Sequence, residues 1–236
     1  MKSTYFLLSA MTASLLLVGC NGDNVDTGSN EINSKKISSS EVNVSQSSTN
    51  ENSEVERVVT HGNFVEYETE AELFADAELV VIASTNEDFM DREHIVKYVP
   101  SSDEEEGLPK AIEDFYTKTS ITVEQVLKQP ASEKVADNKK ISVIEPIALL
   151  EDGSKILSVE NYQEISRGQQ YIIYLKKNTN GKYGVINMTN GRFNLESTDQ
   201  IVNLAEHGHD NDKAKHEKMK DTVKNRFAKE IAKAKK

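Results

Sequence analysis

The chain has 236 residues, a single cysteine and no tryptophan, and its formal net charge at neutral pH is −11. One cysteine excludes an intrachain disulfide framework. The acidic balance argues against nucleic acid as a partner, because phosphate binding of that kind needs a basic face. The charge is also uneven: residues 61–212 hold 29 acidic and 14 basic side chains, whereas residues 213–236 hold three acidic and ten basic ones.

The N-terminus joins one basic residue to a short apolar segment. Lys2 precedes an uncharged stretch at residues 5–18. Its fourteen residues are too few to cross a bilayer as a helix, which takes about twenty, but they suit the apolar region of a signal peptide. No later stretch is apolar for as long, so we expect no transmembrane helix after it. The segment runs directly into Leu17-Val18-Gly19-Cys20 and not into an Ala-x-Ala cleavage pattern.

This tetrapeptide resembles the lipobox of bacterial lipoproteins, with Leu17 at position −3, Gly19 at −1 and Cys20 at +1. The resemblance implies that residues 1–19 are a signal peptide and that fatty acyl chains such as palmitate are attached to the Cys20 thiol. Two acyl chains make membrane attachment stable where one would be marginal. The expected location is therefore the extracytoplasmic face of the cell membrane. The alternative is an ordinary buried or reactive cysteine.

Lipidation would consume the only thiol, so we expect neither a cysteine nucleophile nor a thiolate metal site downstream. Residues 20–56 are expected to form a tether. Ser and Asn occupy 16 of the 36 positions from 21 to 56, without an aromatic residue or a leucine. Such a composition cannot offset chain entropy, so we expect a disordered segment and no ordered structure before about residue 60.

Residues 57–203 are predicted to form the folded domain. A short helix is expected to open it at residues 70–77, with Thr69 as its N-cap and acidic residues in the first turn. Its buried stripe would consist of Leu73, Phe74 and Ala77. The continuous apolar run at residues 79–83 then predicts a central strand that is covered on both faces.

The remaining pattern indicates short strands and tight turns. The alternation within residues 114–128 changes phase at Glu124-Gln125, which predicts a β-bulge. Asn180-Gly181 and Asn190-Gly191 are each typical of hairpin turns. Residues 154–165 are ambiguous between a strand with a loop and an irregular excursion. Further strands are predicted at residues 94–99, 140–146, 170–176, 182–188 and 192–195.

The predicted fold class is therefore mainly β (α+β): a partly closed antiparallel OB-like barrel with one short N-terminal helix and a C-terminal amphipathic basic helix. The segments at residues 77–83, 120–128, 141–145 and 167–175 occur in an order similar to that in uncharacterised extracellular domains of Gram-positive surface lipoproteins. They also distantly resemble the OB-type barrel of netrin-like modules and tissue inhibitors of metalloproteinases. Those inhibitors depend on an N-terminal cysteine and disulfides. This chain has a single cysteine and cannot form a disulfide within itself, so the resemblance implies a fold and no activity.

Residues 204–236 are predicted to form a histidine-containing hinge and a basic helix. From Lys213 to Lys236 there is no Gly or Pro. A narrow apolar stripe recurs every four residues at Met219, Val223, Phe227 and Ile231. The helix could pack loosely on the acidic domain by charge attraction, stay solvated, or lie on anionic headgroups or wall polymer.

Two clusters of potential metal ligands are interpreted as solvated segments. The hinge at residues 206–212, with His216 beyond it, carries zinc-type ligands that crowd in one loop, whereas zinc sites need ligands that converge from a rigid scaffold. Asp103-Glu104-Glu105-Glu106 lacks the alternation and turn glycine of a calcium loop. We predict no metal and no cofactor.

Catalytic motifs of the common hydrolase, metalloprotease and phosphate-binding types are absent from the sequence after residue 20. Neither His61 nor His94 has a partner defined by a motif. We therefore predict no catalytic residue, and Cys20 as the single site residue, for lipid attachment. The expected function is a non-enzymatic binding role at the cell envelope, with an envelope protein or polymer as partner. The alternative is an envelope enzyme or protease-inhibitor-like module whose site is built from non-contiguous residues.

Overall fold

The computed structural model of the protein describes residues 55–100, 110–160, 162–196 and 210–235. The predicted signal peptide, Cys20 and most of the predicted tether lie outside these ranges, as do the acidic segment 103–106 and His207 and His209 of the predicted hinge. The predictions made for those residues stay predictions.

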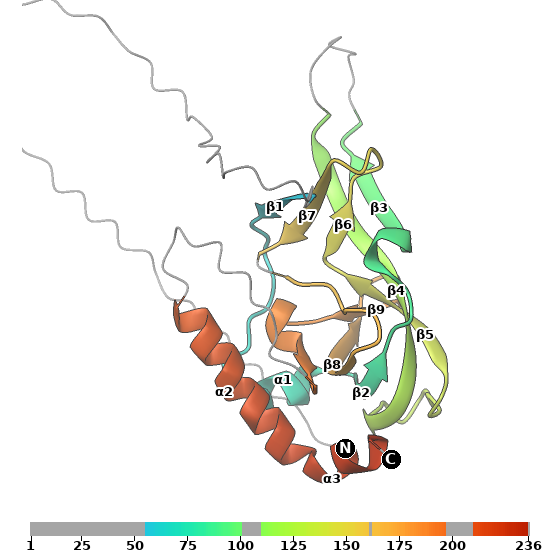
Figure 1. Cartoon of the computed structure of the whole chain (residues 1–236), viewed down its shortest axis with the longest axis vertical. Helices are drawn as coiled ribbons and strands as arrows, with labels where there is room; N and C mark the ends of the chain where they lie inside the picture. The colour runs from blue at the N-terminus through green and yellow to red at the C-terminus, as the bar shows by residue number, and fades with distance from the viewer. Residues whose placement is uncertain (1–54, 101–109, 161, 197–209, 236) are drawn as a thin grey trace, which may run out of the picture. The chain divides into compact units, whose positions relative to one another are not determined.

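Five strands form a closed barrel (Figure 1). They are β2 (Leu79–Ser84), β4 (Ile112–Lys128), β5 (Lys140–Glu145), β9 (Tyr183–Val185) and β8 (Gln170–Lys177). Strand β2 pairs antiparallel with β4 and β8, β4 pairs antiparallel with β5, and β8 pairs antiparallel with β9. The ring closes where β5 and β9 run parallel, with Ile144 opposite Gly184. The predicted OB-like barrel is confirmed, with one parallel pairing among the antiparallel ones.

Strand β4 is 17 residues long and pairs with three neighbouring strands. Its N-terminal end pairs with β3 (Glu93–Tyr98), its middle with β5 and its C-terminal end with β2. Opposite β2, the register skips Glu124 and Leu127. The bulge predicted at Glu124-Gln125 is confirmed, and Leu127 adds a second one. Bulges bend a strand and increase its twist, which barrel closure requires.

A second, three-stranded sheet lies beside the barrel strands. It consists of β1 (Glu56–Thr60), β7 (Lys155–Val159) and β6 (Ile147–Leu149), with β1 parallel to β7. Strand β1 thus places ordered structure before residue 60, earlier than expected, because the β-branched run Val58-Val59-Thr60 gains a pairing partner far along the chain. The domain therefore opens on a strand and not on a helix. The ambiguous segment 154–165 contains β7.

Helix α1 (Glu70–Asp76) forms as predicted. The Thr69 side chain accepts a hydrogen bond from the Glu72 backbone N–H, and the Glu72 carboxylate accepts one from the Thr69 N–H. This capping box satisfies donors that the first turn cannot pair internally. Leu73 and Ala77 are buried, whereas Phe74 is partly exposed.

The two predicted Asn-Gly turns have different outcomes. Residues 178–182 connect β8 to β9 in a hairpin, and Gly181 has a φ of 71°. The prediction for Asn190-Gly191 is wrong, because these residues end a 3-10 helix, η2 (Met188–Gly191), that leads into β10 (Arg192–Asn194). The positive φ angles fall at Asn187 and Met188 instead. Gly191 is required for space, since a Cβ there would lie 1.6 Å from the Ile186 carbonyl oxygen.

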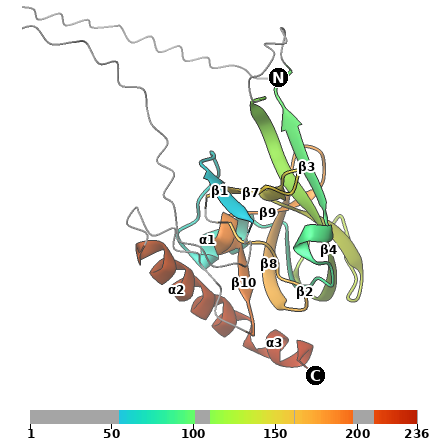
Figure 2. The same cartoon turned by 45° about the horizontal axis from the view of Figure 1, so that its top comes forward.

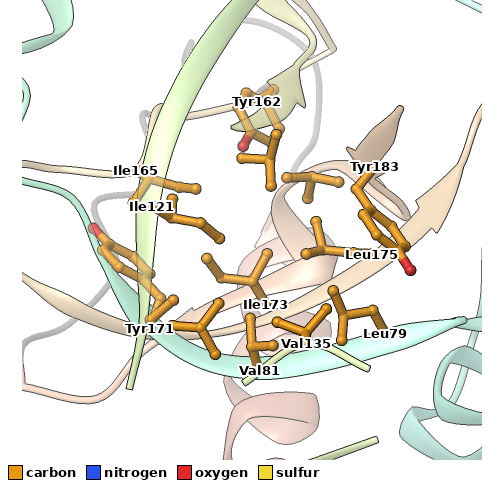
Figure 3. Close-up of a cluster of buried hydrophobic side chains, with 14 of the residues drawn as sticks. Leu79, Val81, Ile121, Val135, Tyr162, Ile165, Tyr171, Ile173, Leu175 and Tyr183 are labelled. Atoms are coloured by element: carbon orange, nitrogen blue, oxygen red, sulfur yellow. The ribbon is translucent and has the colours of Figure 1, made fainter. Parts of the chain in front are cut away.

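The central strand β2 separates two apolar clusters. Leu79, Val81 and Ala83 point into the barrel, where Figure 3 shows Leu79 and Val81 beside Ile173 and Leu175 of β8. The alternate residues of β2, Val80 and Ile82, belong to an outer cluster that also contains side chains of α1 and the C-terminal helices. The prediction that this strand is covered on both faces is confirmed.

The basic tail forms two helices, α2 (Asp210–Arg226) and α3 (Ala228–Ala234), and not the single helix expected. Both views place α2 alongside α1 (Figure 1 and Figure 2). The predicted stripe is buried in the outer cluster, with Met219, Val223 and Phe227 exposed by 7% or less. Of the three alternatives, the structure shows packing on the domain, and apolar contact supplements the expected charge attraction.

Candidate functional site

Arg92 and Glu145 form an ion pair inside the domain. The Arg92 Nη1 lies 2.9 Å from the Glu145 Oε1, and both side chains are 0% exposed. Arg92 follows the 3-10 helix η1 (Phe89–Asp91), and Glu145 ends β5. The Arg92 Nη2 also donates to the carbonyl oxygens of Glu87 and Ile165, at 2.9 and 2.6 Å. The guanidinium thereby links a loop, a helix end and a barrel strand.

Both oxygens of the Glu145 carboxylate accept two hydrogen bonds each. Its Oε1 also accepts from the Thr119 hydroxyl, and its Oε2 accepts from the Tyr162 hydroxyl at 2.8 Å and the Ile165 N–H at 2.7 Å. Burial, reinforced by the neighbouring carboxylate, raises the pKa of Tyr162 well above its usual value. Because the two charges are matched and their polar atoms, apart from the unpartnered Arg92 Nε, are hydrogen-bonded within the protein, we interpret this group as structural.

The histidines that the structure describes are separate from one another. His61 is exposed and pairs with Glu160 at 3.1 Å. His94 is held between Thr117, the Phe89 carbonyl and the Leu149 N–H. His216 belongs to α2, where its ring stacks on Phe193 with 5.2 Å between centroids. Within the described ranges, no three His, Cys, Asp or Glu side chains are grouped to hold a metal ion.

His94 has a structural role, because both of its ring nitrogens form hydrogen bonds within the domain. Its Nε2 lies 2.9 Å from the Phe89 carbonyl oxygen, to which it donates, and its Nδ1 accepts from the Leu149 N–H at 3.2 Å. Burial, together with the charge of Arg92, lowers the pKa of His94 from 6.5. The ring therefore stays neutral at neutral pH and joins β3 to β6.

An open pocket of about 310 Å³ lies on the outer surface of the barrel, over the seam between β5 and β9. The two strands share a single residue pair, Ile144 with Gly184, whereas β5 pairs with β4 over six residues. Ser142 and Ile144 alternate with the buried Val143 and so face away from the core. They form one wall of the pocket, and Tyr183 of β9 contributes to the opposite wall.

Three lysines line this pocket: Lys118 from β4, Lys177 from the end of β8 and Lys182 from the β8–β9 hairpin. One carboxylate, Glu133, lines it with them. Lys177 forms an ion pair with Glu133, and the Tyr183 hydroxyl donates to the same carboxylate at 3.2 Å. The hydrogen bond from Lys177 lowers the pKa of Glu133 and raises the pKa of Lys177.

The other two lysines differ in their partners. Lys118 pairs with the exposed Glu93 at 2.5 Å. Lys182 makes no ion pair with another residue that the structure describes. The pocket thus presents three ammonium groups and one carboxylate in a strongly acidic chain. Sequence reasoning missed it, because Lys118 is far along the chain from Lys177 and Lys182 and the three belong to no linear motif.

No protein-family model matches the chain, and no curated protein matches it. None of the helices in the described ranges is both long and apolar enough to cross a membrane. Cys20, the one predicted site residue, lies outside those ranges. Its acylation is therefore a prediction from the sequence.

Proposed function

We propose that this chain is a lipid-anchored protein of the extracytoplasmic membrane face, and that its OB-like domain binds an envelope component without catalysing a reaction. The observation that carries the proposal is Leu17-Val18-Gly19-Cys20 directly after the uncharged apolar stretch 5–18. Two acyl chains on Cys20 would give stable attachment. The partner would be an envelope protein or polymer that reaches the outer surface of the barrel.

The organisation of the domain supports a binding role on its outside. The barrel interior is filled by apolar side chains (Figure 3), and its buried charges, Arg92 and Glu145, compensate each other and bond to neighbouring groups, with only the Arg92 Nε unpartnered among their polar atoms. The lysine-lined pocket at the β5–β9 seam is open to solvent and combines charged, hydroxyl and aromatic side chains. Such a mixture of polar groups over an apolar wall is typical of binding sites.

Metabolic labelling with a radioactive fatty acid, followed by detergent phase partition, tests the anchoring. We expect the wild-type chain to be labelled and to enter the detergent phase. Cys20→Ser removes the acceptor thiol, so the variant should be unlabelled and recovered in the aqueous phase. Gly19→Ala keeps a small residue at the predicted cleavage position and serves as the control that stays labelled. An unlabelled, aqueous wild-type protein would refute the proposal.

A further inference from the structure

We propose that the pocket at the β5–β9 seam binds a phosphate group, as a phosphomonoester or phosphodiester. The inference rests on the proposed function for its setting, since the phosphate would belong to an envelope component. The pocket volume of about 310 Å³ lies at the lower end of the range for small-molecule sites. It therefore suits one phosphate with a short organic substituent.

The first argument is the local reversal of charge. Residues 61–212 contain 29 acidic and 14 basic side chains, yet the pocket gathers three lysines and a single glutamate from β4, the segment between β4 and β5, and the β8–β9 hairpin. Bringing like charges together is unfavourable unless an anion lies between them. Glu133 compensates the charge of Lys177, as the lowered pKa of its carboxyl reflects, and the exposed Glu93 compensates that of Lys118. Lys182 makes no ion pair with another described residue, so one positive charge remains for an incoming anion.

The second argument concerns hydrogen-bond donors. A lysine ammonium group has three N–H donors, and Lys118 and Lys177 each use a carboxylate partner for only part of that set. Both side chains remain partly exposed, at 27% and 35%. Lys182 has no ion-pair partner among the described residues. A phosphomonoester offers three acceptor oxygens and up to two negative charges, and a phosphodiester offers two non-bridging oxygens and one negative charge. Either group can accept hydrogen bonds from Lys182 and from the unused donors of the two paired lysines.

The third argument concerns the walls. The Lys177 ammonium lies over the Tyr183 ring, 5.1 Å from its centroid, and fixes that ring beside the pocket. Ile144 adds an apolar surface, and the exposed Ser142 adds a hydroxyl. The carbon skeleton attached to the phosphate, such as a glycerol unit, would pack mainly on Ile144, since Tyr183 is only 7% exposed. Its hydroxyl groups would meet Ser142.

Titration followed by amide NMR tests the site, using the full-length chain with Cys20→Ser so that no acyl chain contributes. The probes are inorganic phosphate and glycerol 3-phosphate. We expect saturable shifts at Gly181, Lys182 and Gly184, and weaker binding as salt screens the charges. Lys182→Gln should weaken binding about tenfold, as expected for a lost charge-assisted hydrogen bond. Glu133→Gln should strengthen it about threefold, because the only repelling carboxylate in the pocket is gone.

Lys229→Gln provides the matched control. It removes the same charge from the exposed surface of α3, away from the pocket, and should leave the affinity unchanged. Vesicles of phosphatidylglycerol, compared with phosphatidylcholine, identify the source of the phosphate. Binding to phosphatidylglycerol that needs Lys182 assigns it to a lipid headgroup, whereas binding only to the soluble probes assigns it to a soluble or polymeric phosphate.

Two results would overturn the inference: no shift at these amides at saturating phosphate, or equal effects of Lys182→Gln and Lys229→Gln. Vesicle binding that is independent of Lys182, without a response to the soluble probes, would overturn it as well. Fatty acid labelling of Cys20 is read separately on the wild-type chain. Labelled protein without phosphate binding refutes the pocket alone, and unlabelled protein that binds phosphate refutes the anchoring alone.

Discussion

The two faces of strand β2 are covered in different ways. Leu79 and Val81 face the barrel interior, where the surrounding strands close a continuous ring of backbone hydrogen bonds. Val80 and Ile82 face the outer cluster, which α1 and the C-terminal helices cover through side-chain contacts. The inner core cannot be exposed without breaking strand ladders, whereas the outer core is exposed when α2 and α3 detach. Stability should therefore differ between the two faces.

Each face also has a buried carboxylate, and the two are satisfied differently. Glu145 receives its partners from the barrel and its connecting loops. Glu70 of α1, with a side chain 3% exposed, accepts from the Tyr174 hydroxyl at 3.0 Å and from Arg226 of α2 at 3.0 Å. The Arg226 guanidinium also lies 3.7 Å from the centroid of the Phe74 ring. Detachment of α2 would therefore leave Glu70 without its cation, which favours the docked state.

Loss of the inner carboxylate should have the largest effect. Glu145→Ala leaves the Arg92 guanidinium buried without a counter-charge, which costs about 3–5 kcal/mol. Urea unfolding measures this loss. Glu145→Gln keeps the shape of the side chain and one acceptor oxygen, so its unfolding free energy should fall by less. This variant can be measured if the alanine variant fails to fold.

Asp114→Ala is the control for that comparison. Asp114 pairs with Lys97 at 3.0 Å, but both side chains are about half exposed. Exposed pairs contribute up to about 1 kcal/mol, so this variant should stay close to the wild type. Equal losses for Asp114→Ala and Glu145→Ala would show that the inner ion pair has no special weight.

Removal of the aromatic anchor of the tail should have a smaller and more local effect. Phe227 is 7% exposed and lies 6.0 Å from Phe74, centroid to centroid. Phe227→Ala should cost about 3 kcal/mol, because it deletes a ring from the outer cluster. Hydrogen exchange should accelerate across α2 and α3 and change less in the β2–β8 ladder.

Lys229→Ala, at an exposed position of α3, should change the unfolding free energy by no more than about 0.5 kcal/mol. Uniform acceleration of exchange in the tail and in the barrel after Phe227→Ala would contradict the distinction between the two faces. The two cores would then unfold as one unit.

Local signals in the sequence predicted the elements that depend on local physics. The continuous apolar run of β2 indicated burial on both faces, and Thr69 with Glu72 indicated the start of α1. The stripe at Met219, Val223 and Phe227 indicated one apolar helix face, although it left open whether that face packs on the domain. In each case the residues that produce the pattern are those that make the contact.

Features that depend on distant segments could not be predicted in this way. Ile144 meets Gly184 in a parallel pair, and Arg92 meets Glu145, but no local pattern marks either partner for the other. The lysine pocket needs that same closure, since β4, β5 and the β8–β9 hairpin meet only when the ring is complete. Asn190-Gly191 failed for a related reason: packing against Ile186 required a residue without Cβ, and the turn geometry moved to Asn187.

Acidification should produce the smallest effect. It should act through His94, whose ring packs against Phe89 of the inner cluster. The His94 Nδ1 faces the Leu149 N–H at 3.2 Å. A backbone N–H can only donate, so that nitrogen must keep its lone pair and the neutral ring carries its proton on Nε2, toward the Phe89 carbonyl. Protonation would turn Nδ1 into a donor, so the hydrogen bond from the Leu149 N–H would be lost and the Thr117 hydroxyl oxygen, 2.8 Å away, would be the acceptor that remains. The contact between β3 and β6 would weaken.

The pH dependence follows from the lowered pKa of His94. Burial is the main cause and the charge of Arg92 adds to it, while the Phe89 carbonyl and Glu145 oppose the shift. Below pH 6.5, the ordinary value, the unfolded chain binds a proton that the folded chain resists, so stability falls with falling pH until the folded pKa is passed.

Unfolding free energies measured across this window should show the decrease in the wild type and in His61→Gln, whose ring is 87% exposed. His94→Gln cannot titrate and should lack it, with faster exchange of the Leu149 amide marking the site in the wild type at low pH. Identical pH profiles for His94→Gln and the wild type would mean that His94 does not cause the decrease in stability.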